Sequence, residues 1–344
     1  MTPGAITPGA PAGRAPGRGA APVSLHDVQA PVRASLDRVV EDLTRILSAG
    51  DGVAAEVSSH LATMRGKLFR PTLLLLASGV AGRPEPRGVP VAAALEVLHL
   101  ASLVHDDAVD HSVLRRGLPT INALFGHQTA VLMGDLLYAR ALTELVRLGD
   151  WDVAQVFADA STRMTLGELR QLGVEDVLAF NEADYDQLIR AKTASLFRAA
   201  CELGALCGAP AYRAPLARYG ERLGMLFQVI DDLLDYTEVQ EVTGKPSGLD
   251  LREHKVTLPL IAALPALDRA ARRRVDALFA DPDPDDGLVA EVVAIVRAHG
   301  GLEYARRRVD GLAADAEDAL AALPDSPARA ALAAAIAYAQ DRRS

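Results

Sequence analysis

The sequence predicts an all-α protein built as a single large helical bundle. From about Leu25 onward, Ala, Leu, Arg and Glu dominate, and β-branched or aromatic residues rarely alternate with polar ones. The primary signal is therefore the helical period and not the strand period. Half of the 344 residues are hydrophobic, which is enough apolar material for a large core. No break in the pattern resembles a linker and no internal repeat is apparent, so one domain is expected.

Turn-forming and helix-breaking residues divide this pattern into its elements. Residues 1–24 are rich in Gly, Pro and Ala and are predicted to form a disordered tail, so the all-α domain is expected over residues 25–344. Helices are expected between breaks that fall, in chain order, at residues 65–71, 82–90, 117–119, 208–215, 244–248, 281–287 and 324–327.

Composition and charge exclude several classes of protein. The chain has 36 Lys and Arg against 45 Asp and Glu, for a net charge of −9, and a pI near 5.4 argues against nucleic-acid binding. The most apolar long segment, Val89 to Val104, is interrupted by two polar residues, so no transmembrane segment is predicted. The N-terminus lacks the apolar core of a secretory signal, which favours a cytoplasmic protein. Cys201 and Cys207 are too few for a disulfide framework, and buried thiols are expected.

Two segments carry the same unusual acidic pattern, Asp-Asp-x-x-Asp. They are His105-Asp106-Asp107-Ala108-Val109-Asp110 and Ile230-Asp231-Asp232-Leu233-Leu234-Asp235. On a helix, the first and last aspartates lie one above the other, and the second lies three residues before the last, so the carboxylates converge on one face. Both clusters are embedded in apolar sequence, where such a face repels itself and has raised pKa values unless cations compensate it.

Hard divalent cations are the natural partners of these faces. Carboxylate oxygens suit Mg²⁺, which keeps several waters and usually completes its shell with substrate phosphates. A solvated acidic helix face could explain one such cluster, but it explains two identical clusters poorly. The sequence therefore predicts Mg²⁺ and a diphosphate ligand.

Smaller motifs accompany the two clusters. In chain order they are Gly66-Lys67-Leu68-Phe69-Arg70-Pro71, Arg115-Arg116-Gly117, Gly134-Asp135, Lys192-Thr193, Phe227-Gln228, Gly244-Lys245 and Lys255. With these motifs, the chain from about residue 30 to its end resembles the trans-isoprenyl diphosphate synthases, or polyprenyl synthetases. It departs from the family pattern at Leu68, where many members carry a second basic residue, and at Leu249, in a segment that often reads Gly-Asp-Asp. The resemblance implies the isoprenoid-synthase type of bundle, with a central cavity between the helices that carry the two clusters.

The resemblance also implies a Mg²⁺-dependent prenyltransferase. Such an enzyme condenses isopentenyl diphosphate with an allylic diphosphate, head to tail, in repeated cycles. The allylic carbon–oxygen bond ionises, the cation alkylates the double bond of isopentenyl diphosphate, and a proton is lost. Three Mg²⁺ ions bound with the allylic diphosphate are expected to stabilise the developing charge. The expected first ligands are Asp106, Asp110 and Asp231, and the supporting ones are Asp107, Asp232 and Asp235.

The remaining site residues follow from the same resemblance. Contacts with the allylic diphosphate are implied for Arg115, Lys192, Lys245 and Lys255. The positions that hold isopentenyl diphosphate without metal are matched by Lys67, Arg70, His99 and Arg116, where guanidinium groups offer bidentate contacts to phosphate. Thr193 and Gln228 are expected to place neutral dipoles near the carbocation, although ordinary capping or packing would also explain them.

Product length is expected to depend on the helix that carries the first cluster. In this family, the side chains four and five positions before the first aspartate limit the product, and here they are Ser102 and Ala101. Small side chains there leave a cavity open below the reacting carbon, and one further turn brings Leu98. The segment from His99 to Thr120 also resembles the long-chain synthases most, so a product longer than geranylgeranyl diphosphate is expected.

Several alternatives remain open at this point. The floor of the cavity can instead come from the next helix, through Phe125, Leu132 or Met133, and a geranylgeranyl product then follows. A class I terpene cyclase shares the first acidic motif, but it lacks the basic set for a second diphosphate. A non-catalytic subunit of a heteromeric synthase would have lost one cluster or the basic residues. The resemblance implies a homodimer, with helices near Gly134 to Val146 as the candidate interface.

Overall fold

A computed structural model describes residues 23–48, 50–64, 66–82, 86–173, 176–237 and 248–341, and it confirms the all-α class. The helices of the first half are α1 (Leu25–Gln29), α2 (Arg33–Leu47), α3 (Gly52–Thr63), α4 (Phe69–Ser78), α5 (Gly88–Val109), α6 (Ile121–Phe125), α7 (His127–Leu148) and α8 (Trp151–Leu172). Those of the second half are α9 (Glu182–Ile189), α10 (Ser195–Gly208), α11 (Arg213–Thr237), α13 (Leu249–Arg252), α14 (Leu258–Ala263), α15 (Arg269–Ala280), α16 (Asp286–Ala298), α17 (Gly301–Leu320) and α18 (Pro327–Gln340).

Short elements connect these helices. Four are 3₁₀ turns, at Ala30–Val32, Val177–Ala179, Pro210–Tyr212 and Leu264–Ala266. A π-helical turn, Arg190–Ala194, joins α9 to α10. Strands β1 (Leu114–Arg115) and β2 (Leu118–Pro119) form a small antiparallel hairpin. The sequence predicted only a break there, because two-residue strands carry no periodic signal.

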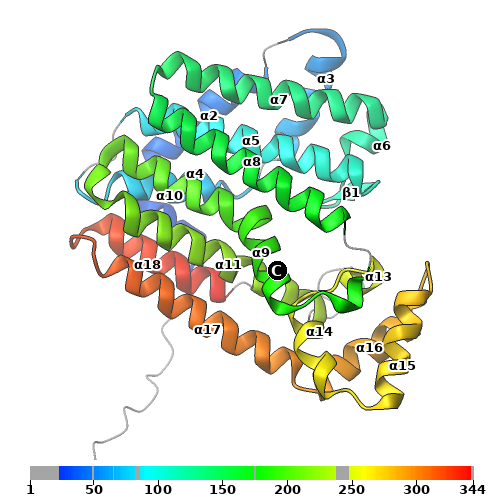
Figure 1. Cartoon of the computed structure of the whole chain (residues 1–344). Helices are drawn as coiled ribbons and strands as arrows, with labels where there is room; N and C mark the ends of the chain where they lie inside the picture. Colours follow the sequence, from blue (N-terminus) through cyan, green and yellow to red (C-terminus); the bar gives the residue numbers. More distant parts are fainter. Residues whose placement is uncertain are drawn as a thin grey trace, which may run out of the picture.

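Helix α5 lies at the centre of the bundle (Figure 1). It packs against α2, α4, α7 and α10, and apolar residues are buried along its whole length. Within the described part of the chain, it is the only helix with the length and hydropathy of a membrane span, and 72% of its apolar window is buried in the protein. Its hydrophobicity is therefore that of a core helix. The first acidic cluster lies at the C-terminal end of this helix.

The structure tests the prediction for the two cysteines but not the prediction for the N-terminal tail. Residues 1–22 lie outside the described residues, so the disordered tail stays a prediction. The first helix begins at Leu25, and Ser24 caps it through a capping box with Asp27. Cys201 and Cys207 are free and buried, as predicted, and burial raises the pKa of the Cys207 thiol to about 11.

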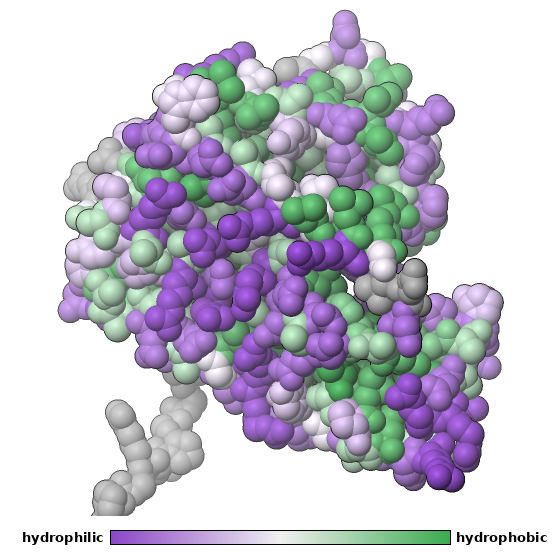
Figure 2. All heavy atoms as spheres, viewed as in Figure 1, coloured by the Kyte–Doolittle hydropathy of each residue, from purple (hydrophilic) through white to green (hydrophobic). Residues whose placement is uncertain are grey.

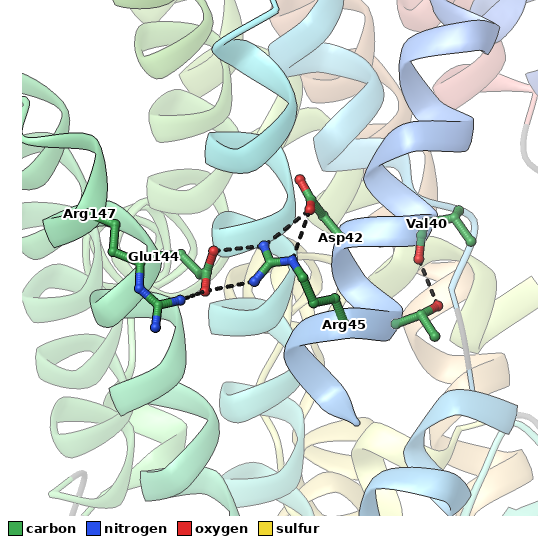
Figure 3. A network of polar contacts seen from close by, with 6 residues as sticks. Val40, Asp42, Arg45, Glu144 and Arg147 are labelled. Atoms are coloured by element: carbon green, nitrogen blue, oxygen red, sulfur yellow. Dashed lines mark hydrogen bonds and ion pairs between the residues drawn. The ribbon is translucent and has the colours of Figure 1, made fainter. Parts of the chain in front are cut away.

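A polar network fixes the N-terminal helices against α7 (Figure 3). The Arg45 guanidinium of α2 donates two hydrogen bonds to the Glu144 carboxylate of α7, at 2.7 and 3.1 Å. Asp42 and Arg147 extend the network on each side. Because Glu144 is largely covered, this bidentate pair holds the far half of α7 in place more firmly than an exposed ion pair does.

Helices α4 and α10 approach so closely that only glycine fits between them. A Cβ atom at Gly204 of α10 would lie 2.2 Å from the Leu74 carbonyl oxygen and 2.7 Å from the Ala77 Cβ atom of α4. We expect Gly204→Ala to lower the free energy of unfolding by about 1–3 kcal/mol, because the helices must separate. Gly311→Ala is the matched control, since nothing lies within 4 Å of its Cβ position in α17, and it should stabilise by about 0.4–1 kcal/mol. Urea unfolding measures both, and equal effects would refute the close-approach argument.

Candidate active site

The two acidic clusters lie at the C-terminal ends of two helices. Asp106 and Asp107 lie in the last turn of α5, and Asp110 caps it. The second cluster lies near the end of α11. A cavity of 330 Å³ lies beside the second cluster, lined by residues of α8, α9, the π-helical turn, α11 and the segment that leads to α14. Asp232 of the second cluster lines it, and Lys255, which also lines it, has Nζ 4.0 Å from Asp110 Oδ2 of the first cluster. Figure 2 shows the surface hollowed below the end of α8, with hydrophobic side chains along its upper rim.

In each cluster, some carboxylates are already bound by the protein. Both carboxylate oxygens of Asp107 share one bifurcated hydrogen bond from the Arg115 Nε–H group, at 2.8 and 3.0 Å. Asp232 accepts hydrogen bonds from the Tyr185 hydroxyl (2.5 Å) and from Gln228 Nε2 (2.8 Å). Burial raises the pKa of Asp232 to about 7, although both of these bonds lower it. These partners hold the two carboxylates inside the protein wall.

Asp235 is held in the same manner, by the backbone. Its two oxygens accept the N–H groups of Leu249 and Asp250, at 3.0 and 3.1 Å, and its carbonyl oxygen accepts the N–H group of Gly248. Asp235 therefore fixes the start of α13 next to the second cluster. A metal ion would have to share this carboxylate with two backbone donors.

The other three aspartates, Asp106, Asp110 and Asp231, are partly or largely exposed. Burial and the neighbouring Glu168 carboxylate raise the pKa of Asp106 to about 6, against the opposing charges of Lys192 and Arg115. Asp110 is half exposed, with Oδ2 4.0 Å from Lys255 Nζ. Asp231 is partly exposed on the facing helix. Asp106, Asp110 and Asp231 are the first metal ligands expected from the sequence, and that role stays a prediction.

The donor set suits a hard cation that brings some of its own ligands. Within the described ranges, no group of three or more His, Cys, Asp or Glu residues is assembled as a complete metal site. Mg²⁺ binds proteins through one or two carboxylates and fills its shell with water and phosphate oxygens. The exposed carboxylates of the two clusters fit that requirement.

Lys192 and Thr193 lie in the π-helical turn, a conformation that often marks functional sites. The turn packs tightly on α8, where a Cβ atom at Gly167 would lie 3.0 Å from the Lys192 backbone nitrogen. Lys192 Nζ contacts Glu168 at 2.8 Å and Gln171 at 3.1 Å, both from α8. The ammonium group is thereby held at the cavity wall, and a phosphate ligand must compete with Glu168 for it.

Thr193 and Gln228 form one hydrogen-bonded chain with the second cluster. The Thr193 hydroxyl donates to Gln228 Oε1 at 2.7 Å, and Gln228 Nε2 donates to Asp232. Both side chains line the cavity. Their dipoles are therefore fixed in orientation, which a catalytic dipole requires.

A second group of cations surrounds the start of α4. Arg70 Nη1 lies 2.9 Å from His99 Nε2, and its guanidinium lies 4.8 Å from the centre of the Phe197 ring. Burial and the adjacent Arg70 and Arg116 charges lower the pKa of His99 well below its ordinary value, so the neutral ring accepts the bond from Arg70. Arg116 Nη1 donates to the Met64 carbonyl oxygen. The exposed Lys67 completes the group, whereas Lys245 lies outside the described residues.

A separate cavity of 460 Å³ lies between α5, α7 and α8. Leu98, Ala101 and Ser102 line it from α5, as expected from the sequence. The Ser102 and Thr165 hydroxyls in this wall donate to carbonyl oxygens of their own helices, so these two hydroxyls are satisfied within the protein. Such a cavity can receive an apolar chain.

The residues proposed from the next helix do not close this cavity. Phe125, Leu132 and Met133 are absent from its lining, and Leu132 is 68% exposed. Tyr138 of α7 lines the cavity instead, with its ring 6.4 Å from that of the buried Phe157 of α8. The sequence offered no signal for this pair, because two aromatic residues on different helices show no relation until the helices are packed.

Two acidic site residues were also missed by the sequence analysis. Asp250 lines the first cavity, and burial with the nearby Asp235 and Asp232 carboxylates raises its pKa to about 8. It ends the Gly-Leu-Asp segment in which only the departure at Leu249 was noted. Glu168 pairs with Lys192 and carries no sequence signal, because a single glutamate on a helix is ordinary.

Comparisons with known proteins agree with this geometry. A family model described as polyprenyl synthetase matches residues 52–296. The chain is 38% identical to an all-trans-nonaprenyl-diphosphate synthase (geranyl-diphosphate specific) of Rhodobacter capsulatus, over 92% of this chain and 98% of the relative. It is 36% identical to a short chain isoprenyl diphosphate synthase of Methanothermobacter thermautotrophicus, over 80% and 86%.

A solved structure shows the same fold. The polyprenyl synthase of Caulobacter crescentus, determined with calcium and isoprenyl diphosphate, superposes with a TM-score of 0.88 at 31% identity. The match covers 95% of this chain and 100% of the other.

Proposed function

The chain belongs to the polyprenyl synthetase family and is a prenyltransferase, and from this premise we propose how its two sites work. The enzyme condenses isopentenyl diphosphate with an allylic diphosphate, head to tail and repeatedly, to a trans-polyprenyl diphosphate longer than geranylgeranyl. The observation that carries this proposal is a cavity lined by Asp232 of the second cluster and by two cations, Lys192 and Lys255, of which Lys255 lies 4.0 Å from Asp110 of the first cluster.

The allylic diphosphate is assigned to the cavity between the clusters. Asp106, Asp110 and Asp231 would hold three Mg²⁺ ions, whose positive charge would stabilise the diphosphate as a leaving group. Asp107, Asp232 and Asp235 support them by fixing Arg115, Gln228 and the start of α13. The proposal is supported by the exposed hard-oxygen donors that each cluster presents.

Charged and dipolar side chains complete this first site. The Lys192 ammonium group exchanges its contact with Glu168 for the diphosphate oxygens. Lys255, which lies near Asp110, also contacts these oxygens. Arg115 and Lys245 are assigned to the same diphosphate. The Thr193–Gln228 pair presents fixed dipoles to the allylic cation. Developing charge is thus met by groups that are already oriented, which reduces reorganisation in the transition state.

Isopentenyl diphosphate is assigned to the cations around α4. Lys67, Arg70, His99 and Arg116 are supported in this role by the Arg70–His99 contact. The neutral His99 accepts from Arg70 and thereby orients the guanidinium without adding a charge to the empty site. This site holds its diphosphate without metal.

The growing chain is assigned to the cavity below Ala101 and Ser102. A long product is supported by the small side chains there and by the name of the Rhodobacter relative. The Tyr138–Phe157 pair is the first bulky obstacle that the chain meets. The cytoplasmic location predicted from the sequence is kept as part of this proposal.

A homodimer formed through α7 completes the proposal. Apolar side chains of α7 are exposed, including Leu132, Leu142 and Val146 at 68%, 39% and 67%, and such a face is typical of an interface. We expect Val146→Glu to convert the dimer to a monomer in sedimentation velocity. Val53→Glu is the control, since Val53 is 57% exposed on α3 and lies outside the face. A wild-type monomer would refute the dimer.

A product assay tests the function. The purified chain alone is incubated with labelled isopentenyl diphosphate and dimethylallyl, geranyl or farnesyl diphosphate, with Mg²⁺ or with EDTA. We expect Mg²⁺-dependent elongation of farnesyl diphosphate beyond four isoprene units. A stop at four units would make the enzyme a geranylgeranyl diphosphate synthase. No product from any primer would favour a partner subunit, and a hydrocarbon product would favour a cyclase.

A further inference from the structure

One residue beside the first cavity has an unfavourable backbone conformation. His254 lies in the left-handed region, with φ of +55°, where the Cβ atom of an L-residue crowds its own backbone. Its two chain neighbours, Glu253 and Lys255, both line the cavity. Strained backbone persists only where surrounding contacts enforce it, and it often lies at functional sites.

The contacts that enforce this conformation come from α15. His254 Nε2 lies 2.9 Å from the Asp281 carbonyl oxygen and 3.2 Å from the Leu278 carbonyl oxygen. Both partners are acceptors, so this nitrogen carries the hydrogen. These carbonyl groups belong to the C-terminal end of α15, where helix carbonyls lack intrahelical donors. The imidazole also lies 5.7 Å from the Phe279 ring.

The left-handed backbone turn at His254 determines the position of the Lys255 backbone, from which its side chain extends. The Lys255 N–H group donates to the Asp250 carbonyl oxygen at 2.7 Å, which closes the turn. The ammonium group then lies 2.6 Å from Glu253 and 4.0 Å from Asp110 of the first acidic cluster. A lysine side chain has many rotamers, so its placement depends on a fixed backbone origin.

We propose that His254 is a positioning residue: by bonding to the end of α15, its imidazole holds the left-handed turn that directs Lys255 toward Asp110. The α15–α16 hairpin, at the periphery of the molecule (Figure 1), is thereby connected to the diphosphate site. This inference rests on the proposed function, because it takes the allylic diphosphate as the ligand of Lys255.

A double-mutant cycle tests the proposal. His254→Gly removes the imidazole and relieves the backbone, so it should not lower the melting temperature. Displacing one charged contact should reduce kcat/KM for the allylic diphosphate about tenfold, with an unchanged KM for isopentenyl diphosphate. In a Lys255→Ala background, His254→Gly should have no further effect, because the two residues act as one unit.

Two further variants separate the loss of the His254 hydrogen bonds from the relief of backbone strain and from a general loosening of this segment. His254→Ala loses the same bonds but keeps the strain, so it should match the glycine variant in kinetics and be less stable. Arg252→Ala is the control, because Arg252 also ties this segment to the loop before α16, through the Pro284 carbonyl oxygen and Asp286; its effect should not depend on Lys255. Wild-type kinetics in His254→Gly, or an equal loss in the Lys255→Ala background, would overturn the proposal. An inactive wild-type chain would instead refute the proposed function.

Discussion

Asp106→Asn is expected to lower kcat about 10²- to 10³-fold. The change removes a proposed metal ligand at the point where the leaving diphosphate would gain charge, and the loss of one stabilising group there typically has this magnitude. The melting temperature should not fall. The folded-state pKa of Asp106, about 6, lies above its ordinary value of 3.8, so above that pH the ionised carboxylate destabilises the empty fold and a neutral amide relieves this.

Asp107→Asn is the matched comparison, because Asp107 is the neighbouring carboxylate but is buried against Arg115. Its loss should lower the melting temperature, since it leaves Arg115 without its partner, and reduce kcat less than Asp106→Asn does. Steady-state kinetics and thermal melts of both variants measure the difference. If Asp107→Asn had the larger kinetic effect and Asp106→Asn were active, the assignment of the facing and supporting carboxylates would be wrong.

Ala101→Phe is expected to shorten the product to about farnesyl length. Ala101 is buried on the wall of the second cavity, five residues before Asp106, and an aromatic ring there fills the space just below the reacting carbon. The first condensation needs little of that space, so turnover with dimethylallyl diphosphate should continue. Chain length after dephosphorylation is the measurement.

Leu132→Phe provides the control for this variant. Leu132 was one of the floor residues considered from the sequence, but its side chain is exposed and lies outside the cavity. Its product distribution should equal that of the wild type. An unchanged product in Ala101→Phe, or a shortened one in Leu132→Phe, would move the cavity wall away from α5.

The sequence was sufficient for features that a single helix determines. The spacing within each acidic cluster predicted that Asp106 and Asp110 share a face, and the small residues one turn earlier predicted an open wall at Ala101. Both depend only on the 3.6-residue period. The all-α class followed from the same period over the whole chain.

The sequence was insufficient where two distant segments meet. Asp235 turned out to bind the backbone at Leu249 and Asp250, and no spacing within α11 predicts that partner. Glu168 gained its role only through its contact with Lys192. The Tyr138–Phe157 pair likewise required the packing of α7 on α8. Such contacts come from tertiary packing, which local pattern does not encode.

The most direct test of the account is a comparison of metal dependence between the two diphosphate sites. Binding of isopentenyl diphosphate alone and of farnesyl diphosphate alone is measured by calorimetry, each with Mg²⁺ and with EDTA. We expect EDTA to weaken farnesyl diphosphate binding on the order of 100-fold, because the acidic clusters hold that diphosphate only through cations. Isopentenyl diphosphate should bind about equally with Mg²⁺ and with EDTA, because Lys67, Arg70 and Arg116 are proposed to contact it directly. If EDTA weakened the binding of both ligands equally, or of neither ligand, the assignment of one metal-dependent and one metal-free site would be contradicted.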